Sequence, residues 1–327
     1  MQIEQPTAPA PRAAPRSPAA AWGPRIILLC ILLLGAYFRT LSLSDWDADT
    51  GQHPDERFFS DVASSLRLPA SLGELYDSAR SPMNPRNYER FPLYVYGPFP
   101  QLITRAVAVA LTPPEALPAE VRALAGPPRA GLDPTRPGEV RTDYGPSIPN
   151  PERAFPRLAP LQWIFNPDGA NMTVYGEIQK VGRGLAVLFD LGSIVLVYLI
   201  GRRLFGVRAG LLAALLSALT VMQIQQAHFF VDPIFSTFFC LLSLYWALRI
   251  AQGEGALAYA LVGLSIGAAM ANRITMATLG GVAIVAALIA AVRHAQGAGG
   301  GRRAIGGAGG QILSAALARF LWRELPL

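Results

Sequence analysis

The chain has 327 residues, of which 52% are apolar and only 15% are charged. Soluble domains carry about 25% charged residues, so this composition argues against a soluble enzyme, and the high apolar content argues against a disordered chain. The net charge is +6, and the charged residues are strongly segregated along the sequence. Cys30 and Cys240 both lie in apolar runs, and their spacing fits no zinc, redox or disulfide framework.

The first expected element is a membrane-spanning helix over residues 25–42, with its apolar run at 26–41. A Pro/Ala-rich tail over residues 1–24, which contains Arg12 and Arg16, precedes it and is expected to be a disordered cytoplasmic segment. A signal peptide is the competing interpretation, but no small-residue cleavage site follows the run. We therefore interpret the run as a signal anchor.

A long polar stretch over residues 43–180 follows, and it carries 17 of the 22 acidic residues. Within it, residues 92–111 are apolar enough to suggest a span, but they contain Pro98, Pro100 and Arg105. A charge near the middle of a membrane is costly. The part over residues 112–157 is rich in proline and reads as an irregular insertion with little chemistry.

Five further spans are expected between residues 181 and 293, and a weaker apolar run that could start another helix begins near residue 305 in the Gly-rich segment 294–327. The five spans cover residues 181–200, 209–225, 233–250, 256–271 and 275–292. If 92–111 does not cross the membrane, the tail and the basic turns between spans fall on one side, with ten basic residues against two acidic ones. If it crosses, this positive-inside bias collapses. We therefore expect an interfacial or re-entrant helix at 92–111, and residues 43–180 form one large outer loop.

The densest group of chemically capable side chains lies just after the first span, around His53, Asp55 and Glu56. Adjacent carboxylates at a membrane face can act as a base or bind a metal, although the spacing matches no EF-hand. The competing interpretation is a solvated acidic loop at a helix start, where carboxylates are favoured in any case.

Two outer turns between spans carry the remaining candidates. His228 and Asp232 precede a span that begins at Pro233, where Asp232 could equally serve as the helix N-cap and His228 could be structural. Arg273 lies in a very short outer turn and is a candidate for binding a lipid phosphate, with simple snorkelling as the alternative.

The second span contains Arg183 near its outer end and Asp190 deeper inside. The two residues are seven apart and so share a helix face, and Asp190 needs either a partner or a water-filled cavity. Structural pairing and a functional role are equally compatible with this pattern.

The carboxylates, the His/Asp turn and the arginines would meet near the outer membrane boundary, where a lipid carrier with a charged head group presents its reactive carbon. The matching chemistry is attack by an acceptor on that carbon, with phosphate leaving. A carboxylate would deprotonate the acceptor hydroxyl, and cations would stabilise the phosphate.

Four stretches give the chain a family resemblance. They are HPDERFFSDVA, YERFPLYVYGPF, the run from GRGLAVLFDL to GRRLFGVRAG and on to LLSAL, and QQAHFFVDPIFSTFF. The chain resembles the N-terminal half of lipid-carrier-dependent glycosyltransferases of the GT-C fold, which include protein O-mannosyltransferases and aminoarabinose transferases.

The resemblance implies an all-α polytopic membrane protein with interfacial helices in its first outer loop. It also implies Asp55 as the catalytic carboxylate with Glu56 beside it, a polyprenyl-phosphate sugar donor, and inversion at the anomeric carbon. In many relatives a lysine occupies the turn of Arg273. Relatives usually have eleven or more spans, so we expect this chain, with six or seven, to be truncated.

The sequence thus predicts a multi-pass membrane glycosyltransferase, with its site on the outer face of a bacterial plasma membrane. His53, His228, Asp232, Arg273 and Arg183 would bind substrate or phosphate. The acceptor would be a protein, lipid or glycan and not a nucleic acid. No cofactor is required, although a divalent metal is possible at the acidic cluster. The alternatives are a transporter, motivated by Arg183 and Asp190, and a non-catalytic membrane remnant.

Overall fold

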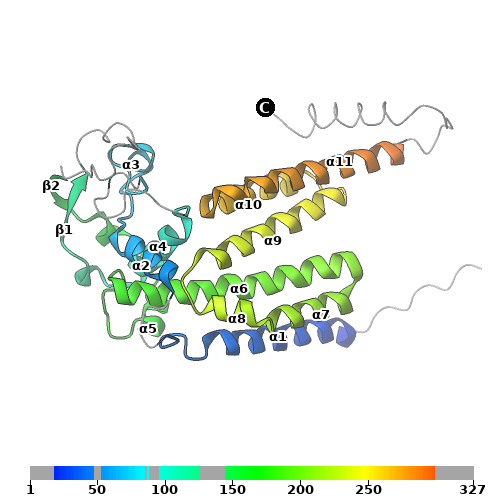
Figure 1. The fold of residues 1–327 in the computed structure, drawn as a ribbon, viewed down its shortest axis with the longest axis horizontal. Helices are drawn as coiled ribbons and strands as arrows, with labels where there is room; N and C mark the ends of the chain where they lie inside the picture. Colours follow the sequence, from blue (N-terminus) through cyan, green and yellow to red (C-terminus); the bar gives the residue numbers. More distant parts are fainter. Residues whose placement is uncertain (1–17, 48–52, 85–86, 88–95, 125–143, 299–327) are drawn as a thin grey trace, which may run out of the picture.

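The computed structural model describes residues 18–47, 53–84, 87, 96–124 and 144–298. Long helices lie side by side and form a bundle, and a smaller set of helices covers one of its ends (Figure 1). The bundle helices are α1 (Pro18–Thr40), α6 (Tyr175–Phe205), α7 (Val207–Ala218), α8 (Val221–Ala227), α9 (Asp232–Ala251), α10 (Ala256–Asn272) and α11 (Leu279–Ala298), the last preceded by the 3-10 helix η4 (Ile274–Thr278).

Helices α1, α6, α9 and η4 with α11 are long and apolar enough to cross a membrane, and α7 with α8 adds a fifth candidate that is bent by 58°. Helix α10 is apolar but has only 17 residues, which corresponds to about 25 Å and is slightly short of a hydrocarbon core of about 30 Å. Large apolar side chains on the bundle are exposed, for example Leu33, Leu216 and Leu264. Exposed leucines are the expected outer surface of helices that face lipid, so the chain is an all-α, multi-pass membrane protein.

The elements at the covered end come from the stretch between α1 and α6, and we call them the cap. They are α2 (Pro54–Ser65), α3 (Leu72–Tyr76), α4 (Phe99–Leu111), η2 (Pro114–Ala116), β1 (Glu120–Leu124), β2 (Tyr144–Pro149), η3 (Pro151–Ala154) and α5 (Ala159–Phe165). The two strands pair antiparallel, with Val121 opposite Ile148. All other regular elements in the described residues are helices. The expected interfacial segment 92–111 contributes α4 to the cap, and residues 88–95 lie outside the described part.

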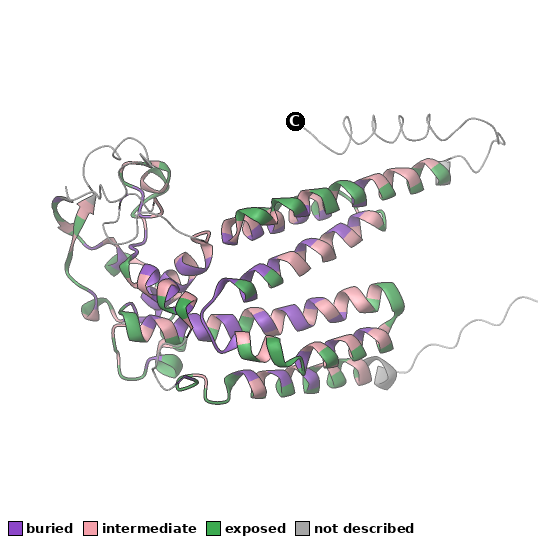
Figure 2. Cartoon of the chain, viewed as in Figure 1, coloured by how far each residue is buried: buried purple, intermediate pink, exposed green. Residues whose placement is uncertain are grey.

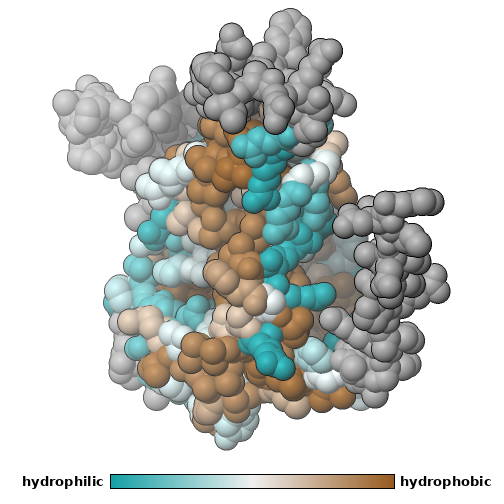
Figure 3. Space-filling view, turned by 90° about the vertical axis from the view of Figure 1, so that its right-hand side faces the viewer, coloured by the Kyte–Doolittle hydropathy of each residue, from teal (hydrophilic) through white to brown (hydrophobic). Residues whose placement is uncertain are grey.

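The opposite end of the bundle collects the start of α1, the α6–α7 turn, the α9–α10 turn and the end of α11 (Figure 1). We call it the basic end, because Arg202, Arg203, Arg208, Arg249 and Arg293 belong to these segments. Figure 3 looks onto this end and shows hydrophilic side chains gathered between hydrophobic ones. The structure therefore brings to one end the described basic turns that the charge count assigned to one side of the membrane. The weak apolar run near 305–322 lies outside the described residues.

Asp190 has a partner from another helix. Its carboxylate forms an ion pair with Arg39 of α1, and both side chains are almost completely buried. Arg39 also donates to the carbonyl oxygens of Ala218, at 2.9 Å, and Ser217, at 3.4 Å, where α7 ends. A cation is favourable at the carbonyl oxygens of a helix end, so the pair neutralises Asp190 and stabilises the break between α7 and α8. This ion pair accounts for the buried charge that had motivated a transporter.

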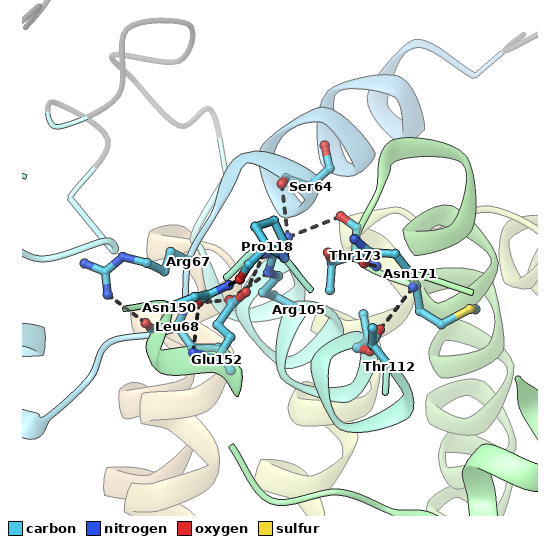
Figure 4. A network of polar contacts seen from close by, with 12 residues as sticks. Ser64, Arg67, Leu68, Arg105, Thr112, Pro118, Asn150, Glu152, Asn171 and Thr173 are labelled. Carbon is cyan, nitrogen blue, oxygen red and sulfur yellow. Dashed lines mark hydrogen bonds and ion pairs between the residues drawn. The ribbon is translucent and has the colours of Figure 1, made fainter. Parts of the chain in front are cut away.

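A second buried ion pair fixes the cap (Figure 4). Arg105 of α4 forms two hydrogen bonds to Glu152 of η3, at 2.9 and 2.7 Å, and donates to the carbonyl oxygens of Ser64 and Thr173. The Glu152 carboxylate also accepts from the backbone N–H of Leu68. The described parts of the Pro-rich segment 112–157 are thus held by specific contacts rather than irregular as expected. Arg105 lies in this polar network, and α4, with 13 residues, is too short to cross a membrane.

The largest buried core joins the cap to the bundle, where α2, α4 and the first half of α6 meet (Figure 2). Phe59 and Phe230 are fully buried in it, with their rings edge to face at 5.3 Å. Gly182 permits this packing, since a Cβ there would lie 2.3 Å from the Phe230 ring. The core fixes the position of α2 relative to the membrane-spanning helices.

Candidate active site

Asp55 and Glu56 occupy the first turn of α2, which begins at Pro54. Proline suits the first helical position because its missing N–H has no partner there anyway, and the free N–H groups of the helix start favour carboxylates. Adjacent residues on a helix point about 100° apart, so the two carboxylates meet different surroundings.

Glu56 points into the core and is 1% exposed. Arg183 of α6 donates to both of its oxygens, at 2.7 and 2.8 Å, and the backbone N–H of Phe230 donates at 2.8 Å. Arg183 also binds Asp47 at 3.1 Å and the carbonyl oxygen of Leu43 at 3.0 Å. The Glu56 carboxylate and the Arg183 guanidinium are therefore engaged in joining α2, α6 and the chain that follows α1.

Asp55 points to the cap surface and is partly exposed. The hydroxyl of Tyr96, just before α4, donates to its Oδ2 at 3.2 Å. Burial raises the pKa of Tyr96, and the negative charge of Asp55 raises it further. The phenol consequently stays protonated at neutral pH and can donate its hydrogen bond to Asp55.

Arg273 approaches Tyr96 from the turn between α10 and η4. Its guanidinium lies over the Tyr96 ring, 5.0 Å from the centroid, and its Nη2 is 3.0 Å from Oδ2 of Asp232. Asp232 is 1% exposed and also accepts from the Ser236 hydroxyl at 2.9 Å, whereas the Arg273 side chain is 38% exposed. One edge of the cation is thus fixed by a buried carboxylate, while the side chain as a whole remains partly exposed.

Gly97 allows these residues to meet. Its N–H donates to the carbonyl oxygen of Asn272 at 2.7 Å, and a Cβ at this position would lie 2.0 Å from the carbonyl oxygen of Ala271. A side chain there would push the segment carrying Tyr96 away from the turn carrying Arg273. The site therefore depends on a glycine that has no chemistry of its own.

Of the residues predicted from the sequence, Asp55, Asp232 and Arg273 are brought together around Tyr96. His228 is fully buried, and its two ring nitrogens face the carbonyl oxygens of Ile224, at 2.7 Å, and Leu41, at 3.1 Å. Neither nitrogen is directed at this group.

Two other predicted substrate ligands lie apart from the Tyr96 group. Arg183 is saturated by its partners in the core, as described above. His53 precedes α2, and its ring packs against Phe229 at 4.9 Å. Its Nδ1 is buried without a hydrogen-bond partner.

Tyr96 and Gly97 were not predicted as site residues, although both belong to the quoted stretch YERFPLYVYGPF. The signal was present: an aromatic residue with a hydroxyl group precedes Gly-Pro at the start of a helix. Nothing in the sequence showed that this turn packs against the turn of Arg273, because the two are far apart along the chain.

In the part of the chain that the structure describes, no group of three or more His, Cys, Asp or Glu side chains could hold a metal ion. Asp55 and Asp232 lie on either side of the Tyr96–Arg273 contact, so the cation already supplies the positive charge between them. A metal at the acidic cluster stays a prediction.

One comparison with known proteins gives a match. A model of the dolichyl-phosphate-mannose-protein mannosyltransferase family matches residues 169–297, which is less than half of the chain. The match covers α6 to α11 and includes Asp232 and Arg273, but it does not reach Asp55 or Tyr96. In this part the chain is similar to membrane glycosyltransferases of the mannosyltransferase type. No curated protein and no solved structure matches the chain.

Proposed function

We propose that the chain transfers a sugar from a polyprenyl-phosphate donor to an acceptor hydroxyl. The observation that carries this proposal is the contact of Asp55, Tyr96, Arg273 and Asp232 at the cap end of a membrane helix bundle. A free carboxylate beside an accessible arginine suits a reaction in which one group loses a proton and another leaves as phosphate.

In the proposed reaction Asp55 takes the proton of the acceptor hydroxyl while the hydroxyl oxygen attacks the anomeric carbon. The bond between that carbon and the phosphate oxygen breaks, and the electron pair leaves with the polyprenyl phosphate. A single displacement of this kind inverts the anomeric carbon. The Tyr96 hydroxyl orients Asp55, since it donates to one carboxylate oxygen and leaves the other for the acceptor.

Arg273 is suited to binding the phosphate because its guanidinium is held in place while its side chain stays partly exposed. Asp232 binds Nη2, the Tyr96 ring covers one face, and Nε is buried without a hydrogen-bond partner. Arginine binds phosphate through two parallel N–H groups, so an oriented guanidinium with free N–H groups fits this ligand. The lipid chain of the donor would lie along the apolar helices.

The proposed site lies on the outer face of the membrane, since the basic end, by the positive-inside rule, faces the cytoplasm. The acceptor is a protein, lipid or glycan presented at that face. The reaction needs no metal, so transfer should continue in the presence of a chelator.

The test uses membranes that contain the full chain and a polyprenyl-phosphate mannose labelled in the sugar, with endogenous molecules as acceptors. The labelled sugar should pass from the lipid fraction to another fraction only when the chain is present. Arg273→Gln should raise the donor KM by about tenfold or more, because one charge-assisted contact to phosphate is lost.

The matched control is Arg80→Gln, since the Arg80 side chain is 69% exposed and pairs with Asp77 at 3.7 Å, away from the Tyr96 group. It should leave transfer unchanged. A wild-type chain that moves no label from this donor would contradict the proposed donor class, and an unchanged donor KM in Arg273→Gln would contradict the phosphate role.

A further inference from the structure

Three fully buried polar side chains on α2 and α4 have no hydrogen-bond partner among the described residues. They are Ser60 of α2 and Gln101 and Thr104 of α4, each 0% exposed, and the unpaired atoms are the two hydroxyl oxygens and both ends of the amide. Nearly all buried polar groups in folded proteins are paired, because an unpaired one has lost its bonds to water without replacement. We call these three side chains the buried polar group.

Two contacts show how α2 and α4 lie relative to each other. At one end the hydroxyl of Tyr96 donates to Asp55 at 3.2 Å, and at the other end Arg105 donates to the carbonyl oxygen of Ser64 at 3.0 Å (Figure 4). Each contact joins two residues that are 41 positions apart. The two segments therefore run side by side in the same direction.

The buried polar group adjoins the candidate site. Ser60 and Gln101 are also 41 positions apart, so they come at the same level of the two segments, between the contacts just described. They follow Asp55 and Tyr96 by five residues each, which is about one and a half helical turns. Thr104 follows Gln101 by three residues and shares its face of α4.

The chemistry of the group favours a neutral ligand that carries several hydroxyl groups. The Gln101 amide offers two donor hydrogens and an acceptor oxygen, and the hydroxyls of Ser60 and Thr104 can each donate and accept. The three side chains carry no charge, whereas the cation suited to a phosphate is Arg273, in a separate turn. A sugar ring matches this set, because each of its hydroxyls also donates and accepts.

We propose that the buried polar group binds hydroxyl groups of the donor sugar, so that Ser60, Gln101 and Thr104 determine which sugar is accepted. This inference rests on the proposed function and assigns sugar contacts within it. The group is covered in the free chain, so the donor must displace side chains to reach it. The unpaired atoms destabilise the covered arrangement and so lower the cost of that displacement. A donor without a matching hydroxyl would leave them unpaired and would be rejected.

The first test asks whether the polar atoms are unpaired in the free chain, by unfolding the purified chain with SDS in mixed micelles. Gln101→Met and Thr104→Val keep the approximate shape of each side chain and remove its polar atoms. The matched control is Thr112→Val, since Thr112 is also 0% exposed but donates to the carbonyl oxygen of Ala108 at 2.7 Å and accepts from the N–H of Met172 at 3.0 Å.

The unfolding midpoint should stay the same or rise in Gln101→Met and Thr104→Val, and should fall in Thr112→Val, because only the control loses hydrogen bonds that were made. A fall in Gln101→Met and Thr104→Val as large as that in the control would show that the group already has partners. This result would overturn the proposal.

The second test measures how strongly two lipids bind, from the rise that each causes in the unfolding midpoint. The lipids are polyprenyl-phosphate mannose and polyprenyl phosphate without a sugar. The sugar-free lipid should bind wild type and Gln101→Met equally, since Arg273 is intact in both. The mannosyl lipid should bind Gln101→Met about tenfold more weakly than wild type, because hydrogen bonds to the sugar are lost.

The outcomes separate this inference from the proposed function. Equal binding of the mannosyl lipid to wild type and Gln101→Met would overturn the sugar contacts and leave the proposed donor standing. A mannosyl lipid that does not bind wild type at all would contradict the proposed donor, and the inference would fall with it.

Discussion

Glu56 and Asp55 are adjacent carboxylates of α2, but their replacement should change the free energy of unfolding by very different amounts. Glu56 accepts three hydrogen bonds, two from Arg183 and one from the backbone of Phe230. Removing one partner of a buried ion pair costs about 3–5 kcal/mol, because the remaining charge is left in the core. Asp47, at 3.1 Å from Arg183, offsets part of this loss, so Glu56→Ala should lower the free energy of unfolding by about 3 kcal/mol.

Asp55→Ala should cost about 1 kcal/mol or less, because it removes one hydrogen bond at a partly exposed position. The assay is unfolding of the purified chain by increasing fractions of SDS in mixed micelles, followed by circular dichroism. Glu56→Gln is the matched control, since it keeps an acceptor for Phe230 and should be less destabilising than Glu56→Ala. Equal unfolding free energies for Glu56→Ala and Asp55→Ala would refute the assignment of Glu56 to the core.

Three further changes follow from particular contacts. Gly97→Ala should destabilise the chain by about 1–3 kcal/mol in the same unfolding assay, since the new Cβ would lie 2.0 Å from the carbonyl oxygen of Ala271. A variant as stable as wild type would show that the Gly97 turn can move without cost, against the close contact described above. The raised pKa of Tyr96 means that its hydrogen bond contributes to stability below pH 10 and is lost as pH rises through the folded pKa. An ultraviolet difference titration should therefore lose a component that titrates above the ordinary tyrosine range in Tyr96→Phe, and a titration with no such loss would contradict the raised pKa of Tyr96. Asp190→Asn should lower the free energy of unfolding by about 3–5 kcal/mol, because Arg39 is left as an unpaired buried charge. The double variant Arg39→Met, Asp190→Leu should be more stable than Asp190→Asn alone, because it removes both charges. A double variant less stable than Asp190→Asn would contradict a simple charge pair.

Four of the six expected spans correspond to helices that are long and apolar enough to cross a membrane, because hydropathy acts locally. The expected span over 209–225 is instead two helices bent by 58°, and the one over 256–271 is a helix of 17 residues. The need of Asp190 for a partner was also predictable, since a carboxylate inside a span cannot stay alone. Its partner was not, because Arg39 lies 151 residues away and no pattern links the two positions.

The candidate site was predictable in part. Asp55, Asp232 and Arg273 were singled out by residue type and position, and they meet around one tyrosine. Glu56 and Arg183 looked equally capable of chemistry. A sequence shows that charges are present but does not show that two of them neutralise each other in a core.

The prediction for His228 relied on its place in a polar turn. In the structure the carbonyl oxygens of Ile224 and Leu41 and the stacked ring of Trp46, at 3.9 Å, surround the imidazole. Such enclosure arises because the segment that follows α1 packs against the end of α8, so composition and spacing could not reveal it.

The role of Asp55 as the base of a sugar transfer can be examined by comparing Asp55→Asn with wild type. Both would be assayed in membranes with labelled polyprenyl-phosphate mannose at equal amounts of folded chain, with Asp168→Asn as the control for an exposed carboxylate. We expect a fall in transfer rate of about 10²–10⁴-fold for Asp55→Asn and no change for the control. Full transfer activity in a folded Asp55→Asn chain would contradict it.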